Sequence, residues 1–321
     1  MSSLLREFYK NKRILITGAD GFIGSYLTEK LLDCGALVSI YVHSDKLKNL
    51  NSIKSKLKNI IVGDISNINT VDLITKNNPE IIFHLATESD VRNSIENPIE
   101  VNKINLDGTL NVLEATRLLK DKGLERLIFV SSYLVYGTKH NKIKESDNFE
   151  PNTPYAASKA AADLYCQSYL KTFNLPIVII RPSNIYGYRQ NKNFIRLFID
   201  SALKDQDIRL EGGGSQTRDL IYIDDVIESL LIIGYDKKAT GETFNLGSES
   251  EISIKEIAEK IINISGSKSK IISVEQRQGQ DLRLCCDVSK FKRLFNWEPK
   301  INIEGGLTKI ISCIKKDENI I

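Results

Sequence analysis

The most constraining feature of this sequence is a glycine-rich turn that joins a strand-like segment directly to a helix-like one. Residues Arg13–Thr17 (RILIT) form a short apolar run, and Phe22–Asp33 has the apolar spacing of a helix. Between them, Gly18, Gly21 and Gly24 follow the spacing GxxGxxG. The first glycine permits a tight turn, the second lets a pyrophosphate approach the backbone, and the third lets the helix pack closely on the strand. Because the N-terminus of a helix attracts phosphates, the segment predicts a dinucleotide-binding unit, with a plain glycine turn as the alternative.

Apolar segments alternate with helix-patterned segments over residues 1–180. The further segments with strand character are Ala36–Val42, Ile60–Val62, Glu80–Leu85, Arg126–Val130 and Pro176–Ile180. The further helical patterns are Thr70–Lys76, Ile99–Lys120 and Tyr155–Phe173. Continuous apolar strands are typical of a sheet covered on both faces, and strand–helix alternation is typical of βαβ units. The sequence therefore predicts an α/β fold with a Rossmann-type, doubly wound parallel sheet.

The pattern changes after about Arg181. Shorter helical stretches (Asn193–Lys204, Ile223–Tyr235, Ser253–Ile264) are separated by loops that contain glycine and arginine. We predict a dinucleotide-binding domain over residues 1–182 and a smaller mixed α/β C-terminal substrate lobe over residues 183–321. Residues 242–246 (ETFNL) are a candidate strand that returns to the main sheet, and the chain from about Lys315 is expected to be loose.

Composition limits the class of protein and of partner. The 321 residues include 44 Lys and Arg against 41 Asp and Glu, so a net charge of +3 gives no reason to expect nucleic acid or an anionic membrane as a partner. Five scattered cysteines without a CxxC pair argue against a disulfide framework and favour a reducing, cytoplasmic setting. Three widely separated histidines predict no metal site. The N-terminus lacks an apolar signal core and no apolar run reaches membrane-spanning length, so we expect a soluble cytoplasmic protein.

The end of the second predicted strand bears on the choice between NAD and NADP. An acidic residue there would bind the adenosine ribose of NAD, whereas a basic one would accommodate the 2′-phosphate of NADP. This chain has Val42, then His43 and Ser44, with Asp45 three residues too late. His43 and Ser44 can cradle a phosphate, so the choice stays open with a slight preference for NADP. Asp64, after the third strand, is a candidate acceptor for the adenine amino group, and a turn-forming role is its alternative.

A tyrosine and a lysine four residues apart begin the helix predicted over 155–173. Asn152 or Thr153 can cap this helix, and Pro154 suits its first position. Tyr155 and Lys159 then share one helix face, where an ammonium group and the helix dipole favour a phenolate. Lowering the pKa of a tyrosine from about 10 to about 7 takes roughly 4 kcal/mol. Lys159, the dipole and an oxidised nicotinamide can supply this together, although YxxxK also occurs by chance on surface helices.

A serine lies where a parallel sheet places its ligands, at the carboxyl end of a strand. Ser131 and Ser132 end the fifth predicted strand, and the Ser132 hydroxyl can bond the same substrate oxygen as Tyr155. The alternative is a serine that satisfies a backbone group at the strand end.

As a set, the motifs of this chain resemble those of the extended short-chain dehydrogenases/reductases, and most closely those of the nucleotide-sugar epimerase/dehydratase branch. The residues that carry the resemblance are the glycine turn, His84-Leu85-Ala86, Ser131-Ser132 with Val135-Tyr136-Gly137, Pro154-Tyr155 with Ser158-Lys159, and Arg181 to Gly187 (RPSNIYG). It continues through Gly214 to Asp219 (GSQTRD) and Tyr222 to Asp225 (YIDD) to Trp297-Glu298-Pro299, and so covers nearly the whole chain.

The resemblance implies a role for specific residues. Ser132, Tyr155 and Lys159 would be catalytic. The cofactor would contact Gly18, Gly21, Phe22, Ile23, Gly24, His43, Ser44, Asp64, Ile65, Leu85, Ala86, Tyr155 and Lys159. A nucleotide-diphosphate sugar would contact Glu88, Ser89, Ser132, Tyr133, Asn184, Arg218 and Arg277. Arginines suit this role because their planar guanidinium groups bind phosphates bidentately, and a solvated surface charge is the alternative for each one.

The resemblance also implies a homodimer, in which the helices Ile99–Lys120 and Tyr155–Phe173 of each subunit form a four-helix bundle. Their apolar positions exceed what one face packed on a sheet requires: Ile104, Leu106, Leu110, Val112, Leu113, Leu164, Tyr165, Tyr169 and Leu170.

The reaction is narrowed by the residues after Ser132. A 4,6-dehydratase of this family carries carboxylates there, whereas this chain has Tyr133 and Leu134. A 4-epimerase needs no further proton-transfer group, and Val91–Gly108 looks like the corresponding region of 4-epimerases. We therefore expect an NAD(P)-dependent nucleotide-diphosphate-sugar 4-epimerase that works through a transient 4-keto sugar. The alternatives are an NADPH-dependent 4-keto-sugar reductase and, less favoured, a 4,6-dehydratase or a non-catalytic dinucleotide-sensing module.

Overall fold

The computed structural model describes residues 3–190, 193–275 and 283–317, and the chain divides into two compact units. Unit 1 consists of Met1–Val135, Pro151–Arg181 and Ile227–Phe244, and unit 2 of Tyr136–Glu150, Pro182–Val226 and Asn245–Ile321. The chain passes from unit 1 to unit 2 between Arg181 and Pro182, next to the boundary predicted at 182/183. Two segments, 136–150 and 227–244, belong to a different unit from the one predicted. Residues 136–150 join unit 2 because Ile143 pairs with Cys286, and residues 227–244 join unit 1 because they cover and extend its sheet.

The core of unit 1 is a seven-stranded sheet with the order β10-β6-β5-β4-β1-β2-β3. Its strands are β1 (Arg13–Thr17), β2 (Leu37–Val42), β3 (Asn59–Val62), β4 (Ile81–His84), β5 (Arg126–Val130), β6 (Ile177–Pro182) and β10 (Thr243–Leu246). The ladders from β6 to β3 are all parallel, and the order reverses beside β1, as in a doubly wound sheet. The predicted fold class and strands are confirmed, including the late strand that returns to the edge of the sheet.

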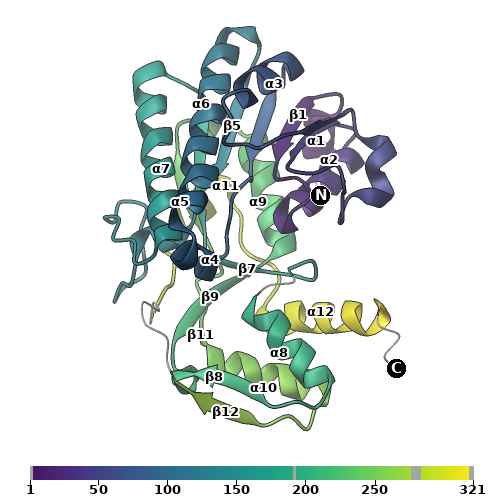
Figure 1. Cartoon of the computed structure of the whole chain (residues 1–321), viewed down its shortest axis with the longest axis vertical. Helices are drawn as coiled ribbons and strands as arrows, with labels where there is room; N and C mark the ends of the chain where they lie inside the picture. Colours follow the sequence, from purple (N-terminus) through teal and green to yellow (C-terminus); the bar gives the residue numbers. More distant parts are fainter. Residues whose placement is uncertain (1–2, 191–192, 276–282, 318–321) are drawn as a thin grey trace. The chain divides into compact units, whose positions relative to one another are not determined.

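Helices cover both faces of this sheet because successive strand side chains point to opposite sides. On one face, Leu15, Ile82 and Phe129 pack against α3 (Thr70–Asn77), α6 (Gly108–Leu119) and α7 (Pro154–Phe173). Figure 1 shows α1 (Ser3–Tyr9), α2 (Phe22–Asp33) and α9 (Ile223–Tyr235) on the other face. There the Tyr9 hydroxyl donates to the Leu231 carbonyl at 2.8 Å and ties α1 to α9.

The helix predicted over Ile99–Lys120 is divided into three pieces. After α4 (Val91–Glu96), the chain forms α5 (Pro98–Asn102), one π-helical turn, η2 (Lys103–Asp107), and then α6. The Thr109 hydroxyl donates to the Asn105 carbonyl at 2.6 Å inside this turn. A π turn is one residue wider than an α-helical turn, and the apolar pattern that predicts a single helix does not reveal it.

Unit 2 is built from small sheets and helices. Its strands are β7 (Asn184–Tyr186), β9 (Thr217–Tyr222) and β11 (Glu251–Ser253) in one sheet, and β8 (Ile208–Glu211) with β12 (Ile271–Val274) in another. Its helices are α8 (Phe194–Leu203), α10 (Ile254–Ser265), α11 (Ser289–Phe295) and α12 (Ile303–Asp317). Unit 2 also contains the short turn η5 (Gly212–Gly214). The other short turns are η1 (Asn51–Lys56), η3 (Lys120–Lys122) and η6 (Lys237–Ala239) in unit 1, and η4 (Tyr133–Tyr136) where the chain passes into unit 2. The expectation of a loose end from Lys315 is wrong for Lys315–Asp317, which are helical, while residues 318–321 lie outside the described part.

The cysteines are all free thiols, four of them buried and Cys313 exposed. Within the described residues, no three His, Cys, Asp or Glu side chains converge as metal ligands would. None of the helices among these residues combines the length and the apolar character needed to cross a lipid bilayer.

Candidate active site

The glycine turn between β1 and α2 has the close contacts that its spacing predicts. Gly18 has a positive φ of 68°, and a Cβ atom on it would lie 2.8 Å from the backbone of Ala86. A Cβ atom on Gly24 would lie 2.4 Å from the Gly18 carbonyl oxygen. Gly21 is the N-cap of α2 and makes no side-chain cap, so the first N–H groups of the helix face the turn. This N-terminus and the residues that follow it, Phe22 and Ile23, fit a pyrophosphate.

An aspartate that the sequence analysis did not single out shapes the loop after β2. The Asp20 carboxylate accepts hydrogen bonds from the backbone N–H groups of Lys48 at 2.7 Å, Asn49 at 2.9 Å and Leu50 at 3.0 Å. It therefore folds this loop back over the glycine turn. Val42 is buried, while His43 and Ser44 are exposed next to the turn, where an adenosine ribose or its phosphate would be recognised.

The predicted contacts at the ends of β3 and β4 differ in character. The Asp64 carboxylate accepts from the Ser66 N–H at 2.9 Å and the Ser66 hydroxyl at 2.8 Å, and these bonds lower its pKa. Asp64 thus forms a local turn, and its contact with the adenine amino group stays a prediction. Ile65 is buried against Gly108. Ala86 lies against Gly18, so the ends of β1 and β4 meet at the glycine turn.

The predicted catalytic side chains come together at the carboxyl end of β5. Thr153 caps α7 by accepting from the Ala156 N–H at 3.2 Å, and Pro154 occupies the first turn. Tyr155 and Lys159 follow one turn apart and are both buried. The hydroxyl groups of Ser132 and Tyr155 share a hydrogen bond, and the Ser132 oxygen also accepts from the Leu134 N–H at 3.2 Å.

The pKa of Tyr155 is raised to about 12, whereas the sequence predicts a lowered value. Burial is the main cause, and the negative charge of Glu88 adds to it, while the hydrogen bond with Ser132 acts in the opposite direction. The Lys159 ammonium donates to the Val130 carbonyl at 2.7 Å and lies 4.4 Å from the ring centre of Phe129. Burial lowers the pKa of Lys159 to about 8. Lys159 is therefore held by the end of β5. Its ammonium group is shielded from water and lies one helical turn after Tyr155 on α7.

Asn105 is a second residue that sequence reasoning missed. Its side-chain oxygen accepts from the Thr87 hydroxyl and from the Glu88 N–H, both at 2.8 Å. Its side-chain nitrogen donates to the Glu88 carbonyl at 3.1 Å and to the Ser158 hydroxyl at 2.9 Å. Ser158 in turn donates to the Tyr155 carbonyl at 2.7 Å. The sequence neighbours Asn102, Lys103 and Asp107 are polar as well, so no signal in the sequence distinguishes Asn105.

Besides Ser132, three of the predicted substrate contacts belong to unit 1. Glu88 is partly buried, Ser89 is exposed and Tyr133 is buried. The Glu88 carboxylate accepts from the Asp90 N–H at 2.9 Å. Because Asn105 binds both backbone groups of Glu88 and also binds α7, Glu88 is held on the same side of the sheet as Tyr155.

Two other predicted contacts belong to unit 2, on neighbouring strands. Asn184 lies opposite Leu220 in the β7–β9 ladder, and Arg218 is two residues from Leu220 on β9. Arg218 is partly buried and donates to the Thr217 carbonyl at 2.7 Å. Arg277 lies outside the described residues.

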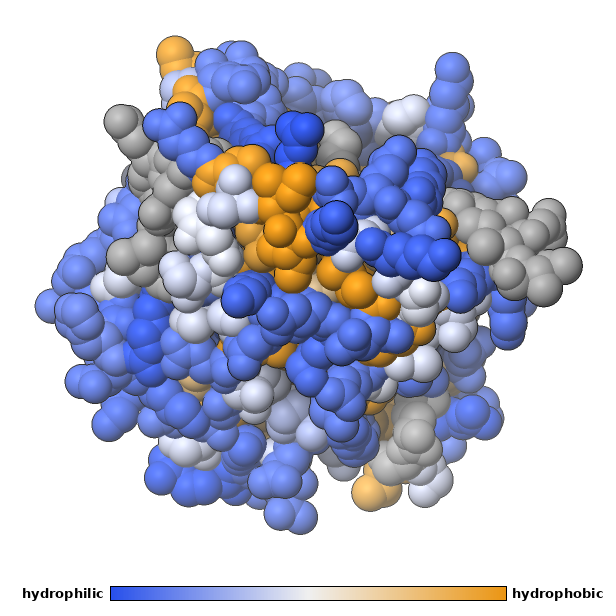
Figure 2. All heavy atoms as spheres, turned by 90° about the horizontal axis from the view of Figure 1, so that it is seen from below, coloured by the Kyte–Doolittle hydropathy of each residue, from blue (hydrophilic) through white to orange (hydrophobic). Residues whose placement is uncertain are grey.

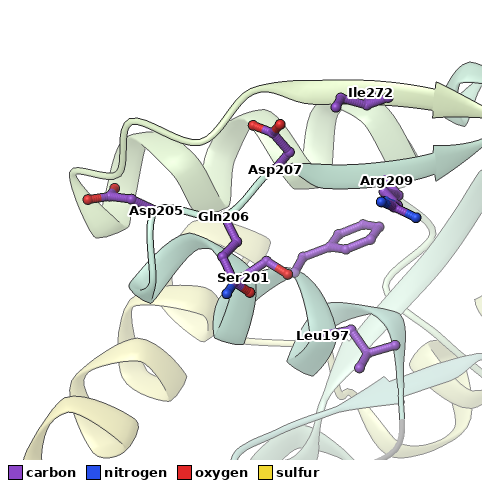
Figure 3. A pocket seen from close by; sticks show the side chains of 8 residues that line it. Leu197, Ser201, Asp205, Gln206, Asp207, Arg209 and Ile272 are labelled. Atoms are coloured by element: carbon purple, nitrogen blue, oxygen red, sulfur yellow. The ribbon is translucent and has the colours of Figure 1, made fainter.

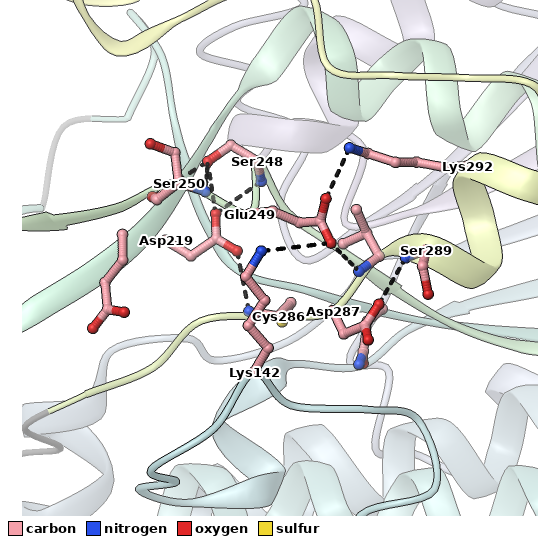
Figure 4. A network of polar contacts seen from close by, with 12 residues as sticks. Lys142, Asp219, Ser248, Glu249, Ser250, Cys286, Asp287, Ser289 and Lys292 are labelled. Carbon is pink, nitrogen blue, oxygen red and sulfur yellow. Dashed lines mark hydrogen bonds and ion pairs between the residues drawn. The ribbon is translucent and has the colours of Figure 1, made fainter.

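A buried carboxylate fixes the strand that carries Arg218. Asp219 accepts from the Ser248 N–H and hydroxyl, both at 2.8 Å, and from the Cys286 N–H at 3.2 Å, and burial raises its pKa (Figure 4). In the same network, Glu249 forms ion pairs with Lys142 at 3.8 Å and Lys292 at 2.8 Å. Asp219 on β9 is thus held by groups from two other segments of unit 2, one at Ser248 and one at Cys286.

A pocket of about 640 Å³ opens in unit 2 between α8, β8 and β12 (Figure 3). Its lining includes Leu197, Phe198, Arg209 and Ile272. Leu197 and Arg209 fall in the stretches 193–197 and 208–214, which we expect to shape the choice of sugar. The face seen in Figure 2 is mostly hydrophilic around a smaller apolar area, and Leu197 and Ile272 are large apolar side chains that remain exposed in unit 2.

Comparison with known proteins gives consistent results along the chain. The sequence profile of the family described as GDP-mannose 4,6 dehydratase matches residues 15–310. A putative UDP-glucose 4-epimerase of Methanocaldococcus jannaschii is 31% identical over 310 residues, covering 95% of this chain and 99% of that protein. The UDP-N-acetyl-alpha-D-glucosaminuronate decarboxylase of Bacillus cytotoxicus is 33% identical over 331 residues, covering 96% and 99%. The structure of UDP-glucuronic acid 4-epimerase from Bacillus cereus, in complex with UDP-glucuronic acid and NAD, is 31% identical with a TM-score of 0.87 and covers 94% of this chain and 99% of that one.

Proposed function

The chain belongs to the GDP-mannose 4,6-dehydratase family of nucleotide-sugar epimerases and dehydratases, and from this premise we propose that it is an NAD(P)-dependent nucleotide-diphosphate-sugar 4-epimerase. The observation that carries the proposal is the hydrogen-bonded pair of Ser132 and Tyr155, with Lys159 one turn further along the same helix. Both hydroxyls lie at the carboxyl end of the sheet, where ligands of a doubly wound fold bind.

The proposed mechanism assigns a proton task to each of these groups. Tyr155 accepts the proton of the sugar 4-hydroxyl, and Ser132 holds the same oxygen by a hydrogen bond. Lys159 supplies a buried positive charge that stabilises the phenolate. A nicotinamide cofactor held at the glycine turn would supply the redox chemistry: it would take the hydride from C4 and give it back to the opposite face of the same carbon. The 4-keto sugar rotates in the pocket and presents its other face to the cofactor site. Tyr155 then returns the proton to the C4 oxygen, and the opposite epimer is formed.

The residues beside Ser132 argue against a dehydratase, despite the name of the family profile. Removing water across C5 and C6 needs an acid and a base beside the sugar. The two residues after Ser132 are Tyr133, which is buried, and Leu134, which has no proton to transfer. An epimerase needs neither group.

We further propose that the sugar contacts Glu88, Ser89 and Tyr133 in unit 1. In unit 2, Asn184 and Arg218 would bind the diphosphate, with Arg277 as a third contact. Arg218 supports this assignment because its guanidinium is held by the Thr217 carbonyl at 2.7 Å, and a group already held loses less side-chain freedom when it binds a phosphate.

The second candidate is an NADPH-dependent 4-keto-sugar reductase, which would use the same three catalytic residues once. His43 and Ser44, exposed after the buried Val42, favour it because no acidic side chain stands there to bind the ribose of NAD. The B. cereus 4-epimerase, by contrast, is solved with NAD. For this chain, the choice between NAD and NADP depends on the residues of the loop at His43 and Ser44.

The test is to incubate the purified protein with UDP-, GDP-, CDP- and dTDP-sugars without added cofactor. Interconversion of C4 epimers, abolished in Tyr155→Phe, is the expected result. Inactivity until NADPH and a 4-keto sugar are supplied would favour the reductase instead. Full turnover by Tyr155→Phe would overturn the catalytic assignment.

A further inference from the structure

A buried histidine lies between the glycine turn and the catalytic helix, and the proposed mechanism does not use it. His84 ends β4 and is 2% exposed. Its Nδ1 atom lies 2.7 Å from the Thr17 hydroxyl oxygen, and its Nε2 atom lies 3.0 Å from the Thr109 hydroxyl oxygen. Each ring nitrogen thus has one hydroxyl partner, one on β1 and one on α6.

The surrounding hydrogen bonds determine which nitrogen carries the proton. The Thr109 hydroxyl has a single proton and donates it to the Asn105 carbonyl at 2.6 Å, so it must accept from His84 Nε2–H. The Thr17 hydroxyl oxygen accepts from the Ala86 N–H at 3.1 Å, and it shares the Leu85 N–H, at 3.2 Å, with the Thr17 carbonyl oxygen. Two N–H groups thus point at the hydroxyl oxygen, which leaves Thr17 the role of donor to an unprotonated Nδ1.

The ring is therefore neutral as well as fixed in one tautomer. Burial and the nearby charge of Lys159 lower the pKa of His84 to about 3, which agrees with a ring that has no room for a second proton. Every hydroxyl and ring nitrogen in this group then has a defined direction of donation.

These bonds form one continuous chain from the dinucleotide turn to the catalytic tyrosine. At one end, Thr17 is the residue before Gly18, and it holds the Leu85–Ala86 backbone against the glycine turn. At the other end, Thr109 holds the carbonyl of Asn105. The Asn105 side chain donates to Ser158, and Ser158 donates to the carbonyl of Tyr155.

We infer that His84 is a positioning residue, which acts through Thr109 and the π turn at Asn105 to set the place of Tyr155 relative to the glycine turn. The inference rests on the proposed function, because it assigns to Tyr155 the proton transfer of that reaction. Placement matters because a displacement of about 1 Å between reacting groups can slow a reaction roughly 100-fold.

The first experiment reads the ring itself in the wild-type protein and needs no activity. Two-bond ¹H–¹⁵N NMR of the His84 ring is expected to show a protonated Nε2 and an unprotonated Nδ1. We expect no titration of the ring between about pH 5 and pH 8. A protonated Nδ1 or a charged ring in this range would overturn the inference.

The second experiment compares Thr109→Val, which keeps the shape but removes the hydroxyl, with Thr109→Ser, which keeps it. In Thr109→Val we expect kcat to fall roughly 10- to 100-fold with KM for the nucleotide sugar within about twofold. Thr109→Ser should retain kcat within about threefold. A general loss of folding would lower the fraction of active enzyme or raise KM in both variants. Equal losses of kcat in Thr109→Val and Thr109→Ser would therefore refute the positioning role.

A third readout separates this inference from the proposed function. The side-chain amide of Asn105 and the backbone amide of Tyr155 should shift in NMR spectra of Thr109→Val and stay in place in Thr109→Ser. These shifts are expected whether or not a nucleotide sugar turns over. An unchanged Tyr155 amide in Thr109→Val would contradict the inference, whereas absence of turnover in the wild type would contradict only the proposed function.

Discussion

At the scale of single residues, the charge that acts on the pKa of the proposed proton acceptor is that of a carboxylate. Glu88 raises the pKa of Tyr155, and its backbone is fixed by Asn105 through both its N–H and its carbonyl group. A negative charge there opposes formation of the phenolate. It also disfavours a second carboxylate in the pocket, and we therefore expect neutral or amino sugars to be preferred over uronic acids.

Replacing Glu88 by glutamine tests this electrostatic role, since the glutamine oxygen can still accept from the Asp90 N–H. Without the charge the pKa of Tyr155 should fall. Activity that requires the phenolate rises with pH through that pKa, so the rising limb of kcat/KM should move to lower pH by up to about one unit. The use of a UDP-uronate relative to the neutral UDP-sugar should increase. Glu96→Gln, an exposed change on α4, is the control, and an identical pH profile in Glu88→Gln and wild type would disprove the effect.

At the scale of elements, the turn from β1 to α2 separates the tasks of two glycines. A methyl group on Gly24 would lie 2.4 Å from the Gly18 carbonyl oxygen, whereas one on Gly21 would lie 3.1 Å from the same oxygen and otherwise face the helix N-terminus. Gly24→Ala should therefore lower the free energy of unfolding by about 1–3 kcal/mol, as other overpacked sites do.

Gly21→Ala should leave the free energy of unfolding nearly unchanged but weaken NADH or NADPH binding at least about tenfold, because its methyl group enters the space for the pyrophosphate. Urea unfolding and cofactor fluorescence titration measure the two quantities. Full cofactor affinity in Gly21→Ala would contradict the assignment of this glycine.

The elements that the sequence predicts well are those whose information is local. The strands of unit 1, α2 and the capped start of α7 follow from apolar period, glycine spacing and the Thr153–Pro154 pair. The π turn, the small strands of unit 2 and the bonds of Asn105 depend on residues far apart in sequence, such as Ser158, which lies 53 positions from Asn105. The raised pKa of Tyr155 was also not predictable, because burial is a property of the packed structure.

At the scale of the whole molecule, the helices beside the catalytic site leave apolar side chains exposed. Ile99 on α5 is 75% exposed, and Leu164 and Tyr165 on α7 are 55% and 44% exposed. Val112 and Leu113, which we expected to contribute, are instead buried in the core of unit 1. The three exposed residues therefore carry the proposal that two chains associate through these helices.

Leu164→Glu should convert the proposed dimer into monomers, because it would bury a charge at the contact. Light scattering after size-exclusion chromatography measures the mass directly. Leu4→Glu, at a position 65% exposed on α1, should leave the mass unchanged. A monomeric wild type, or a Leu164→Glu variant with wild-type mass, would remove the proposal.

Segments of the two units alternate along the chain, and this determines the order in which a ribosome can complete the units. Unit 1 lacks one edge strand and part of a covering helix until residues 227–244 have been made. Its sheet is therefore incomplete when residue 182 has been synthesised. Residues 136–150 wait longer still, because Ile143 pairs with Cys286. A gene cut after residue 182 would therefore encode an incomplete sheet rather than a working dinucleotide module, and the last stretch of translation completes unit 2.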